Sequence, residues 1–455
     1  MARRKTKVTD TSNVELPLDF IQGLSTQYGG TESALIVKAL NSSPSVSIRF
    51  NRRKTDADFI KAHFKDYNPV PVEWCRSGFH LAARPDFIHD PLLHAGIYYV
   101  QEAASMIYEE IMAGLVASIG TGSGNSLRIL DMCASPGGKT TAILNAVRDK
   151  YVVVANEYDR KRSKILKENL DKWGDPNVIV TNSPSARFKE LSDYFDIVAV
   201  DAPCSGEGMM RREPIARSQW SPDLVKQCGS LQREILGDAV SALRPGGFLI
   251  YSTCTFNTIE NESNVDWLLK TYGLEMHLPP RRFMPHQHCC EGLFAAVLKK
   301  PEGNAGVLLR SEKTTKNKRI VKDDIIYISD NDILEERIGD RIFAIPTEVN
   351  YIYQILNKRN FNILSAGVEI AKMKNNSVIP SSRQVVSINF KPDLLPVVDL
   401  DYDQSLLFLK GNPVILQANI SPGYVAVSYL GHPVGLMKNI GPRANNLYPP
   451  EWKIK

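Results

Sequence analysis

The sequence lacks a long apolar run, a secretory leader pattern and a regular cysteine framework. No stretch approaches the roughly 18 apolar residues that a transmembrane helix needs, so we expect no membrane association. The basic start, MARRKTK, is followed by no apolar segment, which argues against a secretory signal. The seven cysteines are odd in number and irregularly spaced, as is typical of free thiols in a reducing compartment. These features predict a cytoplasmic protein.

Strong charge of one sign and metal-ligand spacing are also missing. The net charge of +5 permits a nucleic-acid partner without requiring one. His286, His288, Cys289 and Cys290 crowd together, but adjacent ligands do not have the usual spacing that closes a tetrahedral zinc site. We therefore predict no bound metal. The 455 residues suffice for about two to four globular domains.

Strands and helices alternate regularly from Leu127 onward. Apolar runs predict strands at 128–132, 151–155, 178–181, 196–200 and 248–251. Helical patterns separate most of these runs, at 140–148, 160–173 and 223–243. This alternation predicts an α/β fold with a mostly parallel sheet covered on both faces. Upstream, we expect short helices at 16–28 and 32–40 and a basic strand that begins near residue 45.

Acids and thiols follow the predicted strands at the points where they end. Asp131, Glu157 and Asp201 come at or just after three of the strands, and Cys254 follows the last of them. In an open parallel sheet, ligands bind at the carboxyl ends of the strands. Cys204 and Cys254 there suggest covalent chemistry, with one thiol as nucleophile and the other as helper. The alternative is a pair of buried structural cysteines, because free cysteine is among the most buried residue types.

The loop after the first strand contains the segment CASPGGKT, residues 133–140. A phosphate-binding P-loop would need glycine five positions before Gly138, where this chain has Cys133. The glycine-rich segment 120–124 precedes a strand instead of following one, so we interpret it as a linker. What remains is a tight turn whose glycines allow close approach of a ligand, with Lys139 available for a carboxylate.

Glu157 stands nineteen residues past Gly138, at the spacing of an acid that binds ribose hydroxyls. An adenosine cofactor with an amino-acid tail fits both ends of such a site, and S-adenosylmethionine is such a cofactor. The alternative is an ordinary glycine turn with a solvent-facing glutamate.

Three segments together resemble a known enzyme family. DMCASPGGKT (131–140), DAPCSG (201–206) and YSTCT (251–255) resemble the cofactor and catalytic motifs of the Sun-type RNA 5-cytosine methyltransferases. The similarity covers roughly residues 96–300. The C-terminal segments 423–438 and 446–452 resemble the RsmF-like bacterial subgroup, which modifies small-subunit ribosomal RNA and carries a PUA-like tail domain.

The resemblance implies a Rossmann-like class I methyltransferase domain, an N-terminal α+β region and a C-terminal PUA-like β domain. The implied parts are an N-terminal RNA-recognition region (1–95), the methyltransferase domain (96–302), a basic linker (303–322), a small α+β connecting domain (323–390) and the PUA-like RNA-binding domain (391–455). It also implies a monomer that binds RNA, either ribosomal RNA or an assembling small ribosomal subunit.

The resemblance assigns roles to individual residues. Cys254 would add to carbon 6 of cytosine, and Cys204 would help to break the covalent intermediate. Asp201 would hydrogen-bond or protonate the ring nitrogen, and Lys139 would support the same region. The residues expected to bind S-adenosylmethionine are Cys133, Ala134, Ser135, Pro136, Gly137, Gly138, Lys139, Glu157, Ser183 and Asp201. Family members usually carry an acid after the third strand, whereas this chain reads TNSPS at 181–185.

The RNA contacts carry weaker signals. Arg49 lies in a basic cluster that either contacts the RNA backbone or forms a solvated strand face. Arg211 and Arg212 are predicted to hold phosphates near the target base, with a helix-terminal salt bridge as the alternative. Transfer RNA as substrate, an RNA-binding assembly factor with a vestigial cofactor pocket and a P-loop nucleotidase remain as rival functions.

Overall fold

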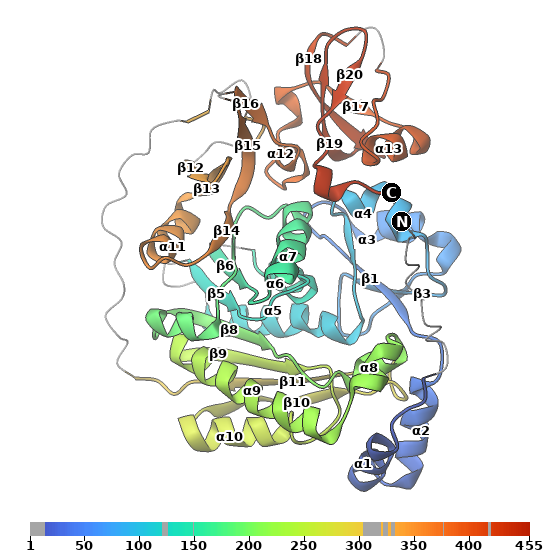
Figure 1. Cartoon of the computed structure of the whole chain (residues 1–455), viewed down its shortest axis with the longest axis vertical. Helices are drawn as coiled ribbons and strands as arrows, with labels where there is room; N and C mark the ends of the chain where they lie inside the picture. The colour runs from blue at the N-terminus through green and yellow to red at the C-terminus, as the bar shows by residue number, and fades with distance from the viewer. Residues whose placement is uncertain are drawn as a thin grey trace, which may run out of the picture.

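The fold is described from a computed structural model. It covers residues 14–120, 126–148, 150–303, 320–321, 326–328, 333–375, 377–416 and 420–455. The predicted glycine linker beyond Gly120 and most of the predicted basic linker at 303–322 lie outside the described residues. Figure 1 shows a large central sheet, a small C-terminal β domain beyond one end of it and a helical pair at the opposite end. In the described ranges, no helix combines the length and apolarity needed to cross a membrane.

The central sheet has eight strands within the described residues, in the order β10-β11-β9-β8-β5-β6-β7-β14. Its middle consists of five mutually parallel strands: β9 (Leu243–Thr253), β8 (Phe195–Asp201), β5 (Leu127–Asp131), β6 (Tyr151–Asn156) and β7 (Val178–Thr181). Three antiparallel strands flank them: β10 (Glu275–Phe283), β11 (Leu293–Lys299) and β14 (Ile363–Ala366). The predicted α/β fold with a mostly parallel sheet is confirmed.

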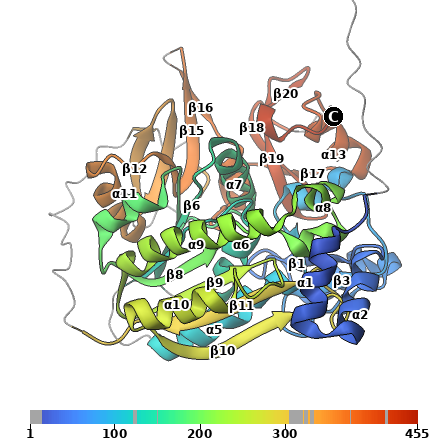
Figure 2. The ribbon, with the colours of Figure 1, turned by 60° about the horizontal axis from the view of Figure 1, so that its bottom comes forward.

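Helices cover both faces of this sheet because the strand side chains alternate in direction. Ile129 and Val153 pack in one core with α5 (Ile107–Ile119), α6 (Gly138–Ala146) and α7 (Arg160–Trp173). Leu130 and Val154 pack in the opposite core with α9 (Pro222–Ala242), α10 (Glu262–Tyr272) and α11 (Thr347–Lys358). Figure 2 shows α9 and α10 lying over β8 and β9. The strands are buried on both sides, as their continuous apolar character predicts.

The N-terminal region begins with the two predicted helices, observed as α1 (Leu18–Tyr28) and α2 (Gly30–Leu40). A four-stranded antiparallel sheet follows: β2 (Val70–Pro71), β3 (Gly78–Leu81), β1 (Val46–Phe50) and β4 (Tyr98–Val100). Short helices connect these strands: α3 (Ala57–His63), α4 (Pro91–His94) and two 3-10 turns (Lys65–Tyr67 and Phe87–His89). A further 3-10 turn, Ala104–Met106, follows β4 and leads into α5. Because β4 pairs with β1, the predicted boundary at residue 95 cuts through this sheet and is wrong by several residues.

The predicted connecting domain at 323–390 is not a separate unit. Its strand β14 pairs with β7 and forms an edge of the central sheet. The other strands build a sheet of their own: β12 (Ile333–Ile338), β13 (Arg341–Pro346), β15 (Val368–Lys374) and β16 (Ser377–Pro380). A four-residue helix, α12 (Arg383–Val386), leads toward the last domain. The predicted boundary at 302 therefore leaves out one strand of the sheet it was meant to enclose.

The C-terminal domain is built around a small sheet with α13 (Tyr402–Leu409) beside it. Its strands are β17 (Val397–Asp399), β18 (Gly423–Tyr429), β19 (His432–Asn439) and β20 (Ala444–Asn446). The 3-10 turns Pro392–Leu394 and Pro450–Trp452 flank this sheet in the chain.

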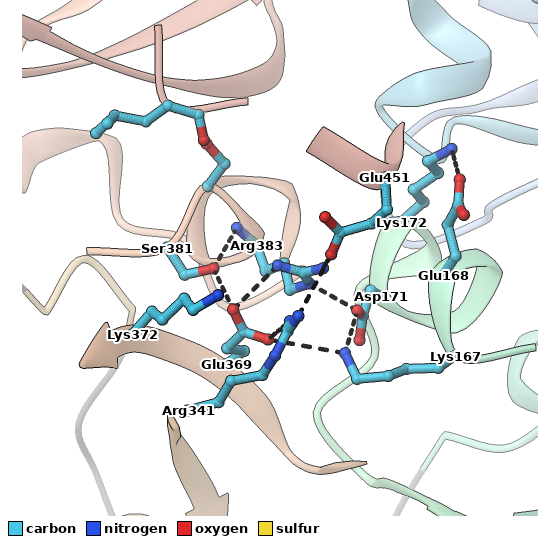
Figure 3. A network of polar contacts seen from close by, with 12 residues as sticks. Lys167, Glu168, Asp171, Lys172, Arg341, Glu369, Lys372, Ser381, Arg383 and Glu451 are labelled. Atoms are coloured by element: carbon cyan, nitrogen blue, oxygen red, sulfur yellow. Dashed lines mark hydrogen bonds and ion pairs between the residues drawn. The ribbon is translucent and has the colours of Figure 1, made fainter. Parts of the chain in front are cut away.

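A buried ion-pair network joins the C-terminal parts to the central domain (Figure 3). Arg383 contacts Asp171 of α7 at 2.7 Å, Glu369 of β15 at 3.0 Å and Glu451 near the C-terminus at 2.6 Å. Lys167 of α7 bridges the same two acids, Asp171 and Glu369. Removing one partner of such a buried group leaves a charge uncompensated, which is strongly destabilising. The network therefore fixes the last two sheets against α7.

Candidate active site

Two thiols meet at the carboxyl edge of the central sheet. Cys204 follows β8 and Cys254 follows β9, and these strands are parallel neighbours. The two sulfur atoms lie 3.2 Å apart, within hydrogen-bonding distance for sulfur. Both cysteines are partly exposed, so a ligand can reach them. Residues fifty positions apart thus share one site because two parallel strands end side by side.

The surroundings of Cys204 favour its protonated form. The hydrogen bond with Cys254 and burial together hold the pKa of the Cys204 thiol well above its ordinary value. The nearby carboxylates of Glu260 and Asp201 act in the same direction. Cys204 therefore keeps its proton at neutral pH. The thiolate is the nucleophilic form of cysteine. A thiol that keeps its proton, such as Cys204, is therefore better suited to assist a nucleophile than to act as one.

An ion pair lies beside the thiols. Asp201, the last residue of β8, accepts a hydrogen bond from the ammonium of Lys139 at 2.8 Å and another from the Ser252 hydroxyl at 2.7 Å. The Tyr108 hydroxyl lies 2.8 Å from that of Ser252. Burial opposes the charge on Lys139, but Asp201 outweighs it, so the pKa of Lys139 is raised. The structure thus holds a carboxylate and an ammonium in fixed positions at the site. Tyr108 and Ser252 are members of this site that the sequence interpretation missed.

The loop at 133–139 leads directly into α6. Gly137 has φ of +110°, a backbone conformation that L side chains rarely adopt, which explains a glycine at the start of this turn. Just before the loop, Asp131 accepts a hydrogen bond from the Thr140 hydroxyl at 2.6 Å. Burial, the largest influence, raises the pKa of Asp131 to about 7. The loop is thereby held between the ends of β5 and α6.

Glu157 lies at the end of β6, close to the same loop. It is buried, accepts a hydrogen bond from the Asp159 amide at 2.8 Å and faces Arg162 at 3.7 Å. Arg162 also donates to the Ser135 carbonyl at 2.9 Å, which connects the acid to the loop. A carboxylate and a glycine turn brought together in this way fit an adenosine cofactor with an amino-acid tail.

The end of β7, where the family usually has an acid, is organised by an asparagine that sequence reasoning missed. The Asn156 side chain accepts from the Ser183 amide at 3.1 Å and donates to the Ser183 carbonyl at 3.0 Å. Asn182 donates instead to the carbonyls of Glu157 and Tyr158, both at 2.7 Å. Asn156 could have been noticed as the polar residue that ends an otherwise apolar strand.

The prediction that Arg49 contacts RNA is wrong. Arg49 is fully buried, its guanidinium lies 4.9 Å from the centre of the Trp173 ring, and it donates to Gln101 at 2.8 Å. It also donates to the Thr141 carbonyl at 3.2 Å. These contacts fix β1 against α6. A basic residue on a strand was predicted to face solvent, but here it satisfies polar groups between two packed elements.

The two arginines after the Cys204 loop lie nearer to the surface. Arg211 is largely buried and donates to the carbonyls of Ser43, at 2.6 Å, and Cys290, at 3.2 Å. Arg212 exposes 39% of its side chain and lies 3.9 Å from Glu291. Arg212 also donates to the Ser45 carbonyl at 3.3 Å, so both arginines tie the N-terminal region to the site, and Arg212 is the more exposed of the two. In the described residues, no cluster of three or more metal-ligating side chains occurs.

Comparison with known proteins gives the class and the family. The family described as 16S rRNA methyltransferase RsmB/F matches residues 123–299. The RsmF N-terminal domain matches residues 16–103 and the RsmF PUA domain residues 395–454. Ribosomal RNA small subunit methyltransferase F from Escherichia fergusonii is 30% identical, with 89% of each chain covered. The same protein from Citrobacter koseri is also 30% identical, with 89% of each chain covered.

Solved structures agree with this match. A methyltransferase homolog protein from Pyrococcus horikoshii is 28% identical with a TM-score of 0.54, covering 62% of this chain and 94% of its own. NSun6 from the same organism, solved with SFG, has a TM-score of 0.54 at 19% identity, covering 64% of this chain and 100% of its own. That second likeness shows the fold alone.

The central sheet, its glycine turn and the acid after β6 define an S-adenosylmethionine-dependent methyltransferase with a PUA domain at its C-terminus. The matches along almost the whole chain then identify the family within this class. The chain belongs to the RsmF family of methyltransferases.

Proposed function

We propose that this protein forms 5-methylcytosine in small-subunit ribosomal RNA through a covalent cysteine–cytosine intermediate. The observation that carries the proposal is the pair of sulfur atoms 3.2 Å apart beside the Asp201–Lys139 ion pair. The printed names of the relatives support ribosomal RNA as the substrate. The PUA match supports RNA binding by the C-terminal domain.

The two thiols suit the chemistry of carbon 5. This carbon is a poor nucleophile until a thiolate adds to carbon 6, which forms a sulfur–carbon bond and makes the ring enamine-like. Bound S-adenosylmethionine supplies an electrophilic methyl group. Once carbon 5 has taken that methyl, it must lose its proton, and the electron pair left behind expels the cysteine sulfur from carbon 6. The first step needs a nucleophilic thiolate, and the last needs a proton acceptor near carbon 5.

We assign the first step to Cys254 and the release to Cys204 with its immediate surroundings. Asp201, held by Lys139 and Ser252, would lie against the cytosine edge and, with a proton on its carboxyl group, would donate to the ring nitrogen as negative charge develops there. The base must leave any stacked helix to reach this edge of the sheet, since chemistry on a base requires an exposed ring.

The cofactor would occupy the space between the glycine turn and Glu157. Backbone groups at 133–138 would approach its amino-acid end, Glu157 would accept hydrogen bonds from the ribose, and the Ser183 backbone would border the adenine. The held position of Ser183 supports this placement, because Asn156 fixes both of its peptide groups.

Glu157→Ala is expected to weaken S-adenosylmethionine binding by about ten- to a hundredfold, the worth of hydrogen bonds to a charged group. Isothermal titration calorimetry measures this directly. The control is Glu190→Ala, which removes an exposed carboxylate paired with its neighbour Arg187. Because Glu157 also accepts from a backbone amide, the melting temperature of both variants is measured beside the affinity. Unchanged affinity in Glu157→Ala would remove this residue from the cofactor site.

Bisulfite sequencing of total RNA, with and without the protein, tests the reaction and the substrate together. We expect a cytosine of small-subunit ribosomal RNA to resist conversion only when the protein is present. If a cytosine of transfer RNA resisted conversion instead, transfer RNA would be the substrate. No change in any RNA would favour an assembly factor with a vestigial cofactor pocket. A substrate in the ribosome fits the predicted cytoplasmic location. Measurement of the molecular mass in solution tests the predicted monomer.

A further inference from the structure

Two buried glutamates cross-connect the loops that carry the thiols. Glu207 belongs to the loop after Cys204, and Glu260 follows the loop after Cys254. Both carboxylates are almost completely removed from solvent. Neither is needed as a reacting group in the proposed chemistry. Buried carboxylates without such a use must be held by hydrogen bonds, because an unsatisfied buried charge costs far more than a neutral side chain.

Glu260 reaches back to the Cys204 loop. It accepts hydrogen bonds from the Ser205 amide at 3.0 Å and from the Ser205 hydroxyl. It also accepts from the side chain of Asn257, in the Cys254 loop, at 2.8 Å. Gln232 of α9 donates to Glu260 at 2.7 Å and to the Pro203 carbonyl at 2.9 Å. One carboxylate thus contacts the residue after Cys204, its own loop and the helix behind both.

Glu207 makes the reciprocal connection. It accepts from the backbone amides of Phe256 at 2.6 Å and Asn257 at 3.0 Å. The Gly208 amide next to it donates to the Cys254 carbonyl at 2.9 Å. Each loop is therefore anchored by a glutamate of the other. The donors are uncharged amide, hydroxyl and indole groups, the last being that of Trp220, and their fixed directions define the geometry more closely than a mobile cationic side chain would.

We propose that Glu260 is a positioning residue for both thiols: its carboxylate holds the two loops together and thereby fixes the separation of the two sulfur atoms. The inference rests on the proposed function for its catalytic consequence. Its geometric basis is that Ser205, directly after Cys204, and Asn257, three residues after Cys254, hydrogen-bond to the same carboxylate. The hydrogen bond with Cys254 and burial contribute most to the raised pKa of the Cys204 thiol, and the charge of Glu260 acts in the same direction.

Glu260→Gln tests this with almost no change of volume. The new amide turns one acceptor into a donor that faces other donors, so the two loops lose their common anchor. Misplacement of about 1 Å can cost on the order of a hundredfold in rate. We expect kcat to fall about ten- to a hundredfold, while the affinity for S-adenosylmethionine stays within about twofold of wild type. RNA-linked protein should accumulate during turnover, because release depends on Cys204.

Thiol labelling gives a readout that needs no RNA and that a purely structural role would not move. With limiting iodoacetamide, mass spectrometry gives the share of label on Cys204 relative to Cys254. Loss of the nearby negative charge should raise the Cys204 share in Glu260→Gln. The matched control is Glu234→Gln on α9, an exposed site two residues from Gln232, which should leave the share unchanged.

Ser205→Ala provides a second variant if Glu260→Gln fails to fold, because it removes one hydroxyl donor and leaves the carboxylate in place. It should shift kcat and adduct level in the same direction, by a smaller factor, while the label distribution stays near wild type because the negative charge remains. A folded Glu260→Gln with wild-type kcat, adduct level and label distribution would overturn the inference. Failure of the proposed function is distinguishable, because the wild type itself would then form neither adduct nor methylated cytosine.

Discussion

Cys254→Ala is expected to abolish both methyl transfer and covalent capture of RNA. Without the sulfur there is no addition to carbon 6, and carbon 5 remains unreactive. Removal of a nucleophile that acts as part of a unit costs about 10⁴-fold or more in kcat. Transfer of a radiolabelled methyl group to RNA measures the rate, and a denaturing gel detects RNA-linked protein. We expect neither signal.

The control for this experiment is Cys289→Ala. Cys289 is an exposed free thiol outside the two loops that carry Cys204 and Cys254, so its removal should leave both signals at wild-type level. Binding of S-adenosylmethionine should also persist in Cys254→Ala, which separates loss of chemistry from loss of the cofactor site. RNA-linked protein in Cys254→Ala would show that the other thiol is the nucleophile.

Cys204→Ala is expected to leave the first steps intact and block the last one. Cys204 lies 3.2 Å from the attacking sulfur and keeps its proton, so its S–H can give a proton to that sulfur as it leaves carbon 6, while a neighbouring group accepts the proton of carbon 5. Loss of a group that assists proton transfer costs about 10²- to 10⁴-fold. The covalent protein–RNA adduct should therefore accumulate in a gel, with the methyl group already on the trapped base.

The double variant Cys204→Ala/Cys254→Ala makes the assignment unambiguous. It should form no adduct, because the trapped species depends on the Cys254 sulfur. If Cys204→Ala instead turned over at the wild-type rate without accumulating adduct, Cys204 would have no part in release. The labelling share of Cys254 in Cys204→Ala shows independently whether that sulfur remains accessible.

The sequence predicted the central sheet well, because its signals are local. Buried parallel strands are continuous apolar runs, and the helices between them have their own period and end signals. The predicted helix at 160–173 coincides with α7, and the strand at 178–181 with β7. The start of β9 was placed at 248 but lies at Leu243. Strand β9 includes Pro245-Gly246-Gly247 because its first residue, Leu243, pairs with Phe195 of β8. The register shifts between this pair and the next, Ile197 with Phe248, which accommodates the extra residues.

Contacts between distant segments were not predictable in the same way. β14 has four residues, and only its pairing with β7, about 180 positions away, makes it part of the central sheet. Arg49 resembled a surface cation because nothing near it in the chain shows that it packs on α6. The crossed contacts of Glu207 and Glu260 likewise depend on the meeting of two loops fifty residues apart.

By itself, the sequence determined the alternation of strands and helices and the placement of acids and thiols at the strand ends, since both follow from residue type and period along the chain. The tertiary structure alone decided which of these groups meet. It placed two sulfur atoms 3.2 Å apart, raised the pKa of the Cys204 thiol and buried Arg49. The physical reason is that distance, burial and hydrogen-bond direction are set by packing between elements, and packing joins residues that the chain keeps far apart.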